Sequence, residues 1–285
     1  MSAAGQGWQP AIANYADRDL DQRQQWYSPA ANAYARVRPG YSAALVKEVA
    51  AIAGLTADSR ILEIGCGPGL ATQAFAALGS RMIALEPNPD FCQLAQTACA
   101  ARPRVEIQPL AFETWPLEAA AFDAVLAATS WHWIPAAISY PKAAAALKPD
   151  GRLILLWNKQ LQPAAEIYRA LQPAYERHAP HLFYYESPDA QLAAMQDLGA
   201  MVLASGHFGD LQAGHTWQQV DYAVEDYLAL LTTYSPYLEL AAPTRTALLA
   251  DLRAMLLAVE GDRLKLTYLS AYQVVCRRAA AGDAA

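Results

Sequence analysis

Long apolar runs are missing from this 285-residue chain, although 54% of its residues are hydrophobic. No uninterrupted apolar stretch approaches the roughly 20 residues that cross a bilayer, which argues against a membrane protein. The first 19 residues also lack a basic region followed by an apolar stretch, so we expect no secretory signal and a cytoplasmic location. An apolar content of this size instead predicts a globular chain with a sizeable core.

Basic residues are also scarce, with 21 Lys and Arg against 27 Asp and Glu, a net charge of −6. This balance argues against a protein that binds the nucleic-acid backbone over a broad surface. It permits a small neutral or anionic ligand held by local groups. The four cysteines form no C-x-x-C pair and lack histidines at zinc spacing, so we expect reduced thiols and no metal site. The expected assembly is a monomer or a homodimer.

An apolar strand, a glycine-rich turn and a helix start follow one another at residues 60–72. The turn contains Gly65, Gly67 and Gly69, and the helix begins at Leu70. Such a turn exposes backbone N–H groups at the positive end of a helix and lets a ligand approach the main chain. The dinucleotide fingerprint needs a glycine where Leu70 stands, so a nicotinamide oxidoreductase is disfavoured. The turn therefore predicts a different nucleotide-like cofactor.

Five apolar strands alternate with helices in the first 160 residues. The strands are predicted at 61–64, 81–85, 105–107, 122–127 and 153–157. Strands and helices that alternate at short intervals predict a parallel, doubly wound sheet. Two further strands are predicted at 212–223 and 264–276. The predicted fold class is therefore α/β, with a mostly parallel seven-stranded Rossmann-like sheet and a helical, aromatic-rich cap.

The chain divides into four predicted segments. They are a flexible lead at 1–26, a cofactor-binding core with an N-terminal flap at 27–159, a helix-rich cap and substrate region at 160–240, and a helix and strand completing the sheet at 241–285. In the flap, Tyr34 and Arg38 have two possible roles. They either lie on a solvated helix edge or cover the carboxylate of a cofactor.

Ligands of open parallel sheets lie beyond the carboxyl ends of the strands, so the residues at those ends are site candidates. Glu86 follows the second strand, 19 positions after Gly67 (86 − 67), where a carboxylate can accept hydrogen bonds from ribose hydroxyls. The candidates after strands three, four and five are Ala111, Phe112, Glu113, Thr129, Ser130, Trp131, His132, Trp133, Trp157 and Asn158. A glycine turn with an acid at the next strand end is a specific signal for a nucleotide-like cofactor.

The pattern Glu63-x-Gly65-x-Gly67-x-Gly69, together with Glu86, resembles motif I of the class I methyltransferases that use S-adenosylmethionine. The resemblance extends over roughly residues 34–278. Segments 38–41 (Arg-Pro-Gly-Tyr), 112–115 (Phe-Glu-Thr-Trp), 131–133 (Trp-His-Trp) and 156–158 (Leu-Trp-Asn) resemble the branch of trans-aconitate methyltransferase-like proteins.

The resemblance implies that S-adenosylmethionine is the cofactor. It implies contacts from Tyr34, Arg38, Glu63, Gly65, Cys66, Gly67, Gly69, Glu86, Pro87, Ala111, Phe112, Ala128 and Thr129. Glu63 would support the turn, Glu86 would bind the ribose, and Arg38 would meet the methionine carboxylate. Many relatives carry an acid near position 111 that accepts from the adenine amino group. Ala111 cannot do so, which requires another adenine contact in this chain.

The same resemblance implies a small-molecule methyl acceptor. His132 is the predicted catalytic base, with a structural histidine as the equal alternative. Trp131, Trp133 and Asn158 are predicted to contact the acceptor, although tryptophans at such positions can also belong to the core. A non-catalytic binding protein on a methyltransferase fold is the second hypothesis.

Overall fold

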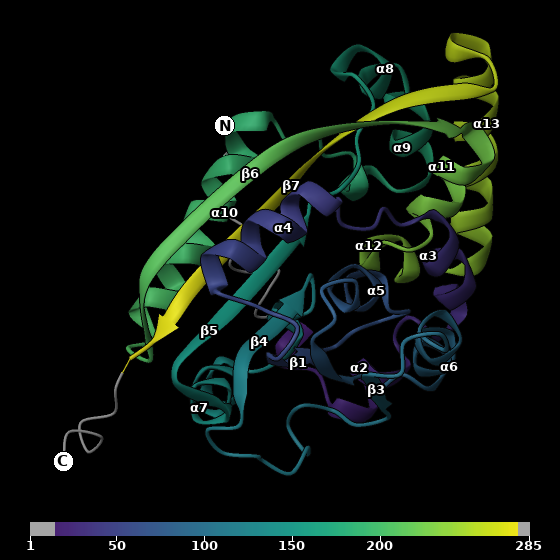
Figure 1. Cartoon of the computed structure of the whole chain (residues 1–285). Helices are drawn as coiled ribbons and strands as arrows, with labels where there is room; N and C mark the ends of the chain where they lie inside the picture. Colours follow the sequence, from purple (N-terminus) through teal and green to yellow (C-terminus); the bar gives the residue numbers. More distant parts are fainter. Residues whose placement is uncertain (1–14, 279–285) are drawn as a thin grey trace.

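The computed structural model describes residues 15–278. Its centre is a seven-stranded sheet in the order β3-β2-β1-β4-β5-β7-β6 (Figure 1). The strands are β1 (Arg60–Ile64), β2 (Arg81–Leu85), β3 (Val105–Gln108), β4 (Phe122–Ala128), β5 (Leu147–Asn158), β6 (Phe208–Ala223) and β7 (Arg263–Arg277). β1 to β5 are parallel, whereas β7 runs antiparallel to β5 and β6 antiparallel to β7. The predicted fold class is confirmed.

Helices cover both faces of the sheet. The first face carries α4 (Ala43–Ala53), α5 (Leu70–Ala76) and α6 (Pro89–Ala98), and the second carries α7 (Ala136–Ala146) and α10 (Pro188–Ala204). The side chain of Asn88 accepts from the Phe91 N–H and so caps α6, with Pro89 as the first helical residue. The sequence alone predicts this start of α6, which sets where the chain turns away after β2.

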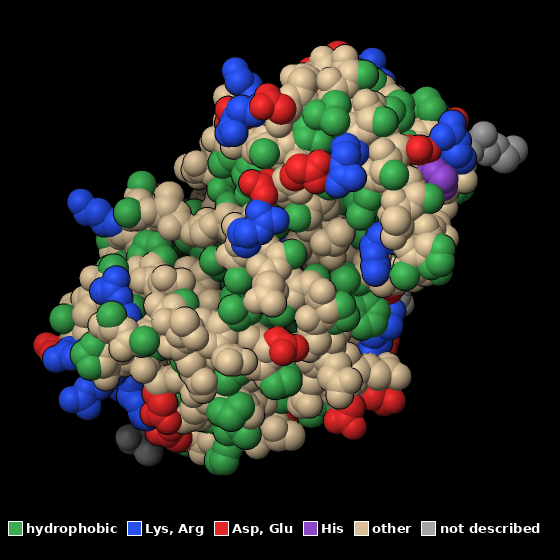
Figure 2. Space-filling view, turned by 90° about the vertical axis from the view of Figure 1, so that its right-hand side faces the viewer, with side chains coloured by type: hydrophobic (Ala, Val, Ile, Leu, Met, Phe, Trp, Pro, Cys, Tyr) green, Lys and Arg blue, Asp and Glu red, His purple; other side chains and the backbone are tan. Residues whose placement is uncertain are grey.

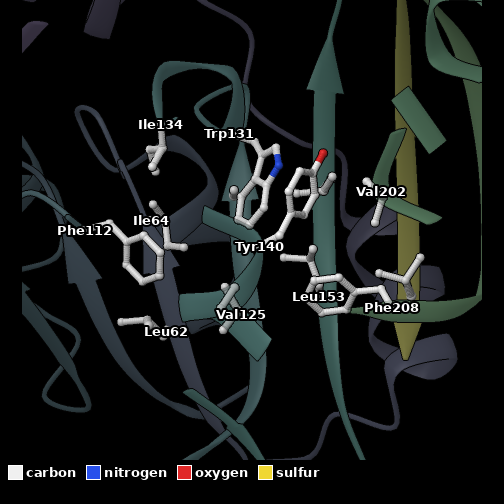
Figure 3. Close-up of a cluster of buried hydrophobic side chains, with 14 of the residues drawn as sticks. Leu62, Ile64, Phe112, Val125, Trp131, Ile134, Tyr140, Leu153, Val202 and Phe208 are labelled. Atoms are coloured by element: carbon white, nitrogen blue, oxygen red, sulfur yellow. The ribbon is translucent and has the colours of Figure 1, made fainter. Parts of the chain in front are cut away.

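The main core lies between the sheet and the second helical face. Figure 3 shows how side chains from β1, β4 and β5 meet those from α7 and α10. Trp131 belongs to this cluster and packs against Tyr140, with ring centroids 5.4 Å apart. Successive residues of a strand point to opposite faces of the sheet. Both faces of these strands are buried, so their sequences are continuously apolar.

A second core fills a helical cap beside the sheet. The cap contains α8 (Ala165–Ala170), α9 (Gln172–His178), η3 (Pro180–Leu182), α11 (Val224–Leu231), α12 (Ser235–Leu238) and α13 (Ala242–Glu260). Its side chains pack on the first half of β7 and on α3 (Ala31–Val37). The segmentation differs from the predicted one, because α10 and β6 belong to the sheet layers and α13 belongs to the cap (Figure 1).

The N-terminal segment also differs from the expected flexible lead. Residues 1–14 lie outside the described part of the chain, but α2 (Leu20–Gln25) and η1 (Ser28–Ala30) are folded onto the carboxyl edge of the sheet. The side chain of Asn88 donates to the Gln24 carbonyl (2.7 Å) and to the Ser28 hydroxyl (3.0 Å). Long-range contacts of this kind stabilise a segment whose own sequence shows little apolar periodicity.

Within residues 15–278, none of the helices combines the length and the apolar character required to cross a bilayer. Figure 2 shows the side on which α13, α11 and α6 lie. Lys and Arg side chains on this face are interspersed with Asp and Glu, and its described residues form no continuous basic surface.

Candidate functional site

A cavity opens where the strand order reverses between β1 and β4, at the carboxyl ends of both strands. This is the place at which open α/β sheets bind ligands. Counting its open mouth, the cavity encloses about 1130 Å³. Its walls come from five parts of the chain: residues 20–41, the glycine turn, the ends of β2 and β3, the end of β4, and residues 158–161.

The glycine turn forms the floor of the cavity. Gly65 and Gly67 have φ values of +64° and +56°, a conformation that side-chain-bearing residues rarely adopt. A Cβ on Gly65 would lie 2.8 Å from the Cβ of Ser130, whereas a Cβ on Gly67 would meet nothing within 4 Å. Gly67 therefore leaves open space above the backbone, where a ligand can approach. Gly69 does not line the cavity and instead lets α5 pack against Ala95.

Glu86 closes the side of the turn at the end of β2. One carboxylate oxygen accepts from the Gly67 N–H (2.7 Å) and the other from the Asn88 N–H (2.8 Å). Burial raises the pKa of Glu86 to about 7. Pro87 lines the cavity beside it. The structure thus brings together the predicted turn and the predicted acid, with the carboxylate facing the space above the glycines.

Glu63 lies beneath the turn and not in the cavity wall. Its side chain is fully buried, with the Thr72 hydroxyl beside the carboxylate. Burial, and secondarily the charge of Glu86, raises the pKa of Glu63 to about 7. The native protein therefore favours the protonated carboxyl group at this position.

Glu63→Gln should change how stability depends on pH. Because the native pKa of Glu63 exceeds the ordinary 4.5, its stabilising contribution is complete below pH 4.5 and is lost as the pH rises to 7. The unfolding free energy of the variant minus that of wild type should therefore increase by about 2–3 kcal/mol from pH 5 to pH 8. Urea denaturation at both pH values measures this difference. Glu260→Gln on the exposed end of α13 is the control and should show no such gain.

The end of β4 supplies the opposite wall. Ala128 and Thr129 line the cavity, and Thr129 has φ +57°, which is unusual for a β-branched residue. The Thr129 hydroxyl pairs with the Tyr41 hydroxyl at 3.1 Å, and the Thr129 N–H donates to the Leu156 carbonyl at 2.8 Å. Backbone strain of this kind is maintained by surrounding contacts and is concentrated at functional sites.

Tyr34 and Arg38 do form part of the cavity wall. The Arg38 guanidinium lies 4.1 Å from the ring centroid of Tyr234 and 4.7 Å from that of Tyr34. It donates to the hydroxyl and the carbonyl of Thr233, both at 2.8 Å. Among the described residues no carboxylate pairs with Arg38. This fixed cation can therefore receive an anionic group of a ligand.

Arg23 is a site residue that the sequence does not predict, and it meets Glu113, which follows the third strand. They form an ion pair at 2.6 Å in the cavity wall, with side chains only 10% and 11% exposed. The same Arg23 guanidinium nitrogen donates to the Trp133 carbonyl. Leu20 and Tyr27 also line the cavity from this segment. Nothing in the local sequence of α2 predicts these contacts, because they depend on how α2 docks on the sheet.

Asn158 lines the cavity but uses its side chain to hold the flap. Its amide nitrogen donates to the carbonyls of Pro39 (3.2 Å) and Gly40 (3.1 Å), and its amide oxygen accepts from the Ser270 hydroxyl (2.7 Å). The side-chain amide thus has few bonds left for an acceptor. Its geometry favours a positioning role over the predicted substrate contact.

The three residues of η2 (Trp131–Trp133) point in different directions. Trp133 lines the cavity and packs on Tyr27, with ring centroids 5.5 Å apart. Trp131 is a core residue, 5% exposed, and does not line the cavity (Figure 3). His132 does not line the cavity either, and its ring lies 5.8 Å from that of Trp157. Burial and, secondarily, Lys159 lower the pKa of His132 to about 4, which makes it a weak base.

The β3 loop and Cys66 complete the predicted set. Phe112 and Cys66 line the cavity, while Ala111 is buried behind it. Burial raises the pKa of the Cys66 thiol, so this side chain is an uncharged part of the wall. The structure therefore gathers most predicted cofactor residues around one space and places Glu63, Gly69 and Ala111 in its supporting layer.

Comparisons with known proteins agree with this geometry. Residues 62–155 match the family model described as a methyltransferase domain. An uncharacterized methyltransferase of Mycobacterium bovis is 33% identical over 132 residues, which cover 46% of this chain and 51% of that protein. A ubiquinone biosynthesis O-methyltransferase of Xanthomonas axonopodis pv. citri is 31% identical over 106 residues, 35% of this chain and 43% of that one. The chain spans about half the length of these curated relatives.

Solved structures show the same fold. A putative type II methyltransferase from Anaeromyxobacter dehalogenans superposes with a TM-score of 0.63 at 20% identity, covering 83% of this chain and 97% of the other. Phosphoethanolamine N-methyltransferase 2 of Haemonchus contortus, in complex with S-adenosyl-L-methionine, gives a TM-score of 0.52 at 15% identity, covering 92% and 60%. Residues 62–155 of this chain are therefore similar to a methyltransferase domain, and the seven-stranded sheet around them has the fold of these methyltransferase structures.

Proposed function

We propose that this chain is an S-adenosylmethionine-dependent methyltransferase that acts on a small-molecule acceptor. One observation carries the proposal: the open backbone at Gly67 faces the Glu86 carboxylate, with Arg38 in the wall of the same cavity. A ligand with a ribose, a carboxylate and a nucleobase matches this set of groups. The roof that α2 forms over the cavity favours a small acceptor over a polymer.

The residues present fit that cofactor. Glu86 would accept from the ribose hydroxyls, Pro87 and Phe112 would border the adenine, and Arg38 would hold the methionine carboxylate. The strained backbone at Thr129 would face the methionine amine. When bound, the cofactor supplies an electrophilic methyl group on a sulfonium. Little charge then needs stabilising, so the protein contributes chiefly alignment and exclusion of water.

Among residues 15–278, the cavity wall offers little for removing a proton from an acceptor once Glu86 is assigned to the ribose. Burial raises the pKa of both Tyr27 and Tyr41, Glu113 is paired with Arg23, and His132 lies outside. We therefore infer an acceptor atom that is already nucleophilic at neutral pH, such as a carboxylate. This inference agrees with the resemblance to trans-aconitate methyltransferase-like proteins, which we retain as a hypothesis.

Calorimetric titration with S-adenosylhomocysteine and with NADH tests the cofactor. We expect micromolar binding of S-adenosylhomocysteine, roughly −8 kcal/mol, and no heat with NADH. A protein that passes this test should then transfer a labelled methyl group to one member of a panel of small carboxylic acids. Absence of S-adenosylhomocysteine binding would overturn the proposal, and binding without transfer to any acceptor would favour the non-catalytic alternative.

A further inference from the structure

The outer edge of the sheet is formed by β6, a long strand that pairs with β7 on one side only (Figure 1). Which of its backbone groups face β7 follows from the register. The backbone N–H of Lys159 donates to the Leu269 carbonyl, and the backbones of Gln162 and Thr267 exchange two N–H···O bonds. The odd-numbered residues of β7 therefore point their backbone N–H and C=O groups away from β6. Even-numbered residues of β7 therefore face β6, and the H-bonded pairs are those such as Gly214–Tyr272 and Thr216–Ser270.

The alternate residues of β6 consequently point their N–H and C=O groups outward. These residues are Ala213, His215, Trp217 and Gln219, and all four are exposed. Within residues 15–278, no second strand pairs with this side of β6, and no backbone hydrogen bond reaches these four residues. The edge thus presents a regular row of unpaired donors and acceptors.

The usual protections of an edge strand are missing along this row. Residues 211–220 (Leu-Gln-Ala-Gly-His-Thr-Trp-Gln-Gln-Val) contain no Lys, Arg, Asp, Glu or Pro. Trp217, 39% exposed, is one of the few large apolar side chains at the described surface. Natural proteins prevent an exposed edge strand from pairing by means of charged residues, proline or a covering segment. An edge without these features is available to pair with another strand.

We propose that β6 pairs with β6 of a second copy of this chain, antiparallel about a two-fold axis, to form a continuous sheet across a homodimer. An antiparallel strand is complementary to itself, so one sequence satisfies both edges. The nearest charged residues on the strand are Asp210 and Asp221. In every register centred on residues 215–217, each aspartate lies opposite an uncharged residue of the partner, so pairing creates no directly opposed charges.

The ends of the edge limit the pairing to a closed dimer. A bulge between Gly209 and Gln212, with Asp210 at φ +51°, interrupts the strand at one end. At the other end Arg263 binds the carboxylate and the carbonyl of Asp221. One partner strand therefore pairs with the whole uncharged segment between these points, and none of the edge is left for a third chain.

Sedimentation velocity of the full chain tests the proposal over concentrations from about 1 to 100 μM, a range in which mass action reveals a dimer. We expect a species of twice the 30.8 kDa chain mass. Trp217→Pro removes an outward N–H without touching the β7 ladder, and Gln219→Lys places a charge on the edge. Each substitution should raise the dissociation constant of the dimer at least about tenfold. Gln93→Lys, on the exposed surface of α6, should leave it unchanged.

Circular dichroism and S-adenosylhomocysteine binding establish that each variant is folded, and Gln219→Lys decides the question if Trp217→Pro does not fold. Amide hydrogen exchange provides a second readout. Protection of Ala213, His215, Trp217 and Gln219 should rise with protein concentration, while that of Gly214 and Thr216 stays constant. A wild type that remains monomeric, or a dimer whose affinity and exchange pattern are unchanged by Gln219→Lys, would overturn the proposal.

Discussion

Glu86→Ala should weaken S-adenosylhomocysteine binding by at least about 100-fold, because it would remove the two charge-assisted hydrogen bonds that we propose to the ribose, each worth about 1.5–3 kcal/mol. The loss has a second source in the free protein. Without the carboxylate, the N–H groups of Gly67 and Asn88 lose their acceptors, and the glycine turn is held less firmly. Calorimetry of the variant beside wild type measures the change in affinity.

The pH dependence of S-adenosylhomocysteine binding distinguishes a direct contact between Glu86 and the ligand from a loss of folded structure. Burial raises the pKa of Glu86 to about 7, so its carboxyl group gains and loses its proton near neutral pH. Wild-type affinity should therefore rise as the pH rises through 7. Glu86→Gln preserves the shape of the side chain but cannot ionise, so this rise should diminish. An affinity in Glu86→Gln that equals wild type at pH 8 would contradict the ribose role.

Arg23→Met should lower the unfolding free energy by about 3 kcal/mol, because it leaves the Glu113 carboxylate buried without its partner. The side chains of both residues are nearly enclosed, at 10% and 11% exposure. Arg23 also joins α2 to the Trp133 carbonyl, so its loss should loosen the roof of the cavity. Urea denaturation followed by tryptophan fluorescence measures both effects, because Trp26 and Trp133 pack against each other at 6.1 Å.

Two further variants identify the cause. In Arg23→Met/Glu113→Gln the uncompensated charge is gone, and most of the lost stability should return. Arg169→Met breaks an ion pair whose side chains are 68% and 77% exposed, and it should cost less than about 1 kcal/mol. The interpretation fails if Arg23→Met costs no more than Arg169→Met, or if the double variant is as unstable as the single one.

The motif-bearing half of the site could be predicted because its chemistry is local. The glycine turn, Glu63 beneath it and Glu86 beside it occupy fixed places relative to two consecutive strands and the helix between them. Parallel strands bring their carboxyl ends to one edge, so the spacing of these residues along the chain fixes their arrangement in space. The cap of Asn88 on α6 is equally local.

The Trp-His-Trp segment shows where prediction from neighbouring residues fails. The sequence places Trp131, His132 and Trp133 after β4, but η2 turns them in three directions. Trp133 lines the cavity, Trp131 packs in the core beside Tyr140, and His132 lies near Trp157. A short irregular segment has no hydrophobic period that fixes which side faces inward, so packing partners distant in sequence decide it.

The sequence by itself determined the fold class, the glycine turn and the acid at the end of β2, because each depends on residues close together along the chain. Tertiary structure alone placed α2 over the cavity, paired Arg23 with Glu113 across 90 residues, and used Asn158 to hold the Pro39–Gly40 turn. It also left β6 as an open edge. These features depend on docking between segments with no shared sequence period, and only the folded chain brings their atoms within bonding distance.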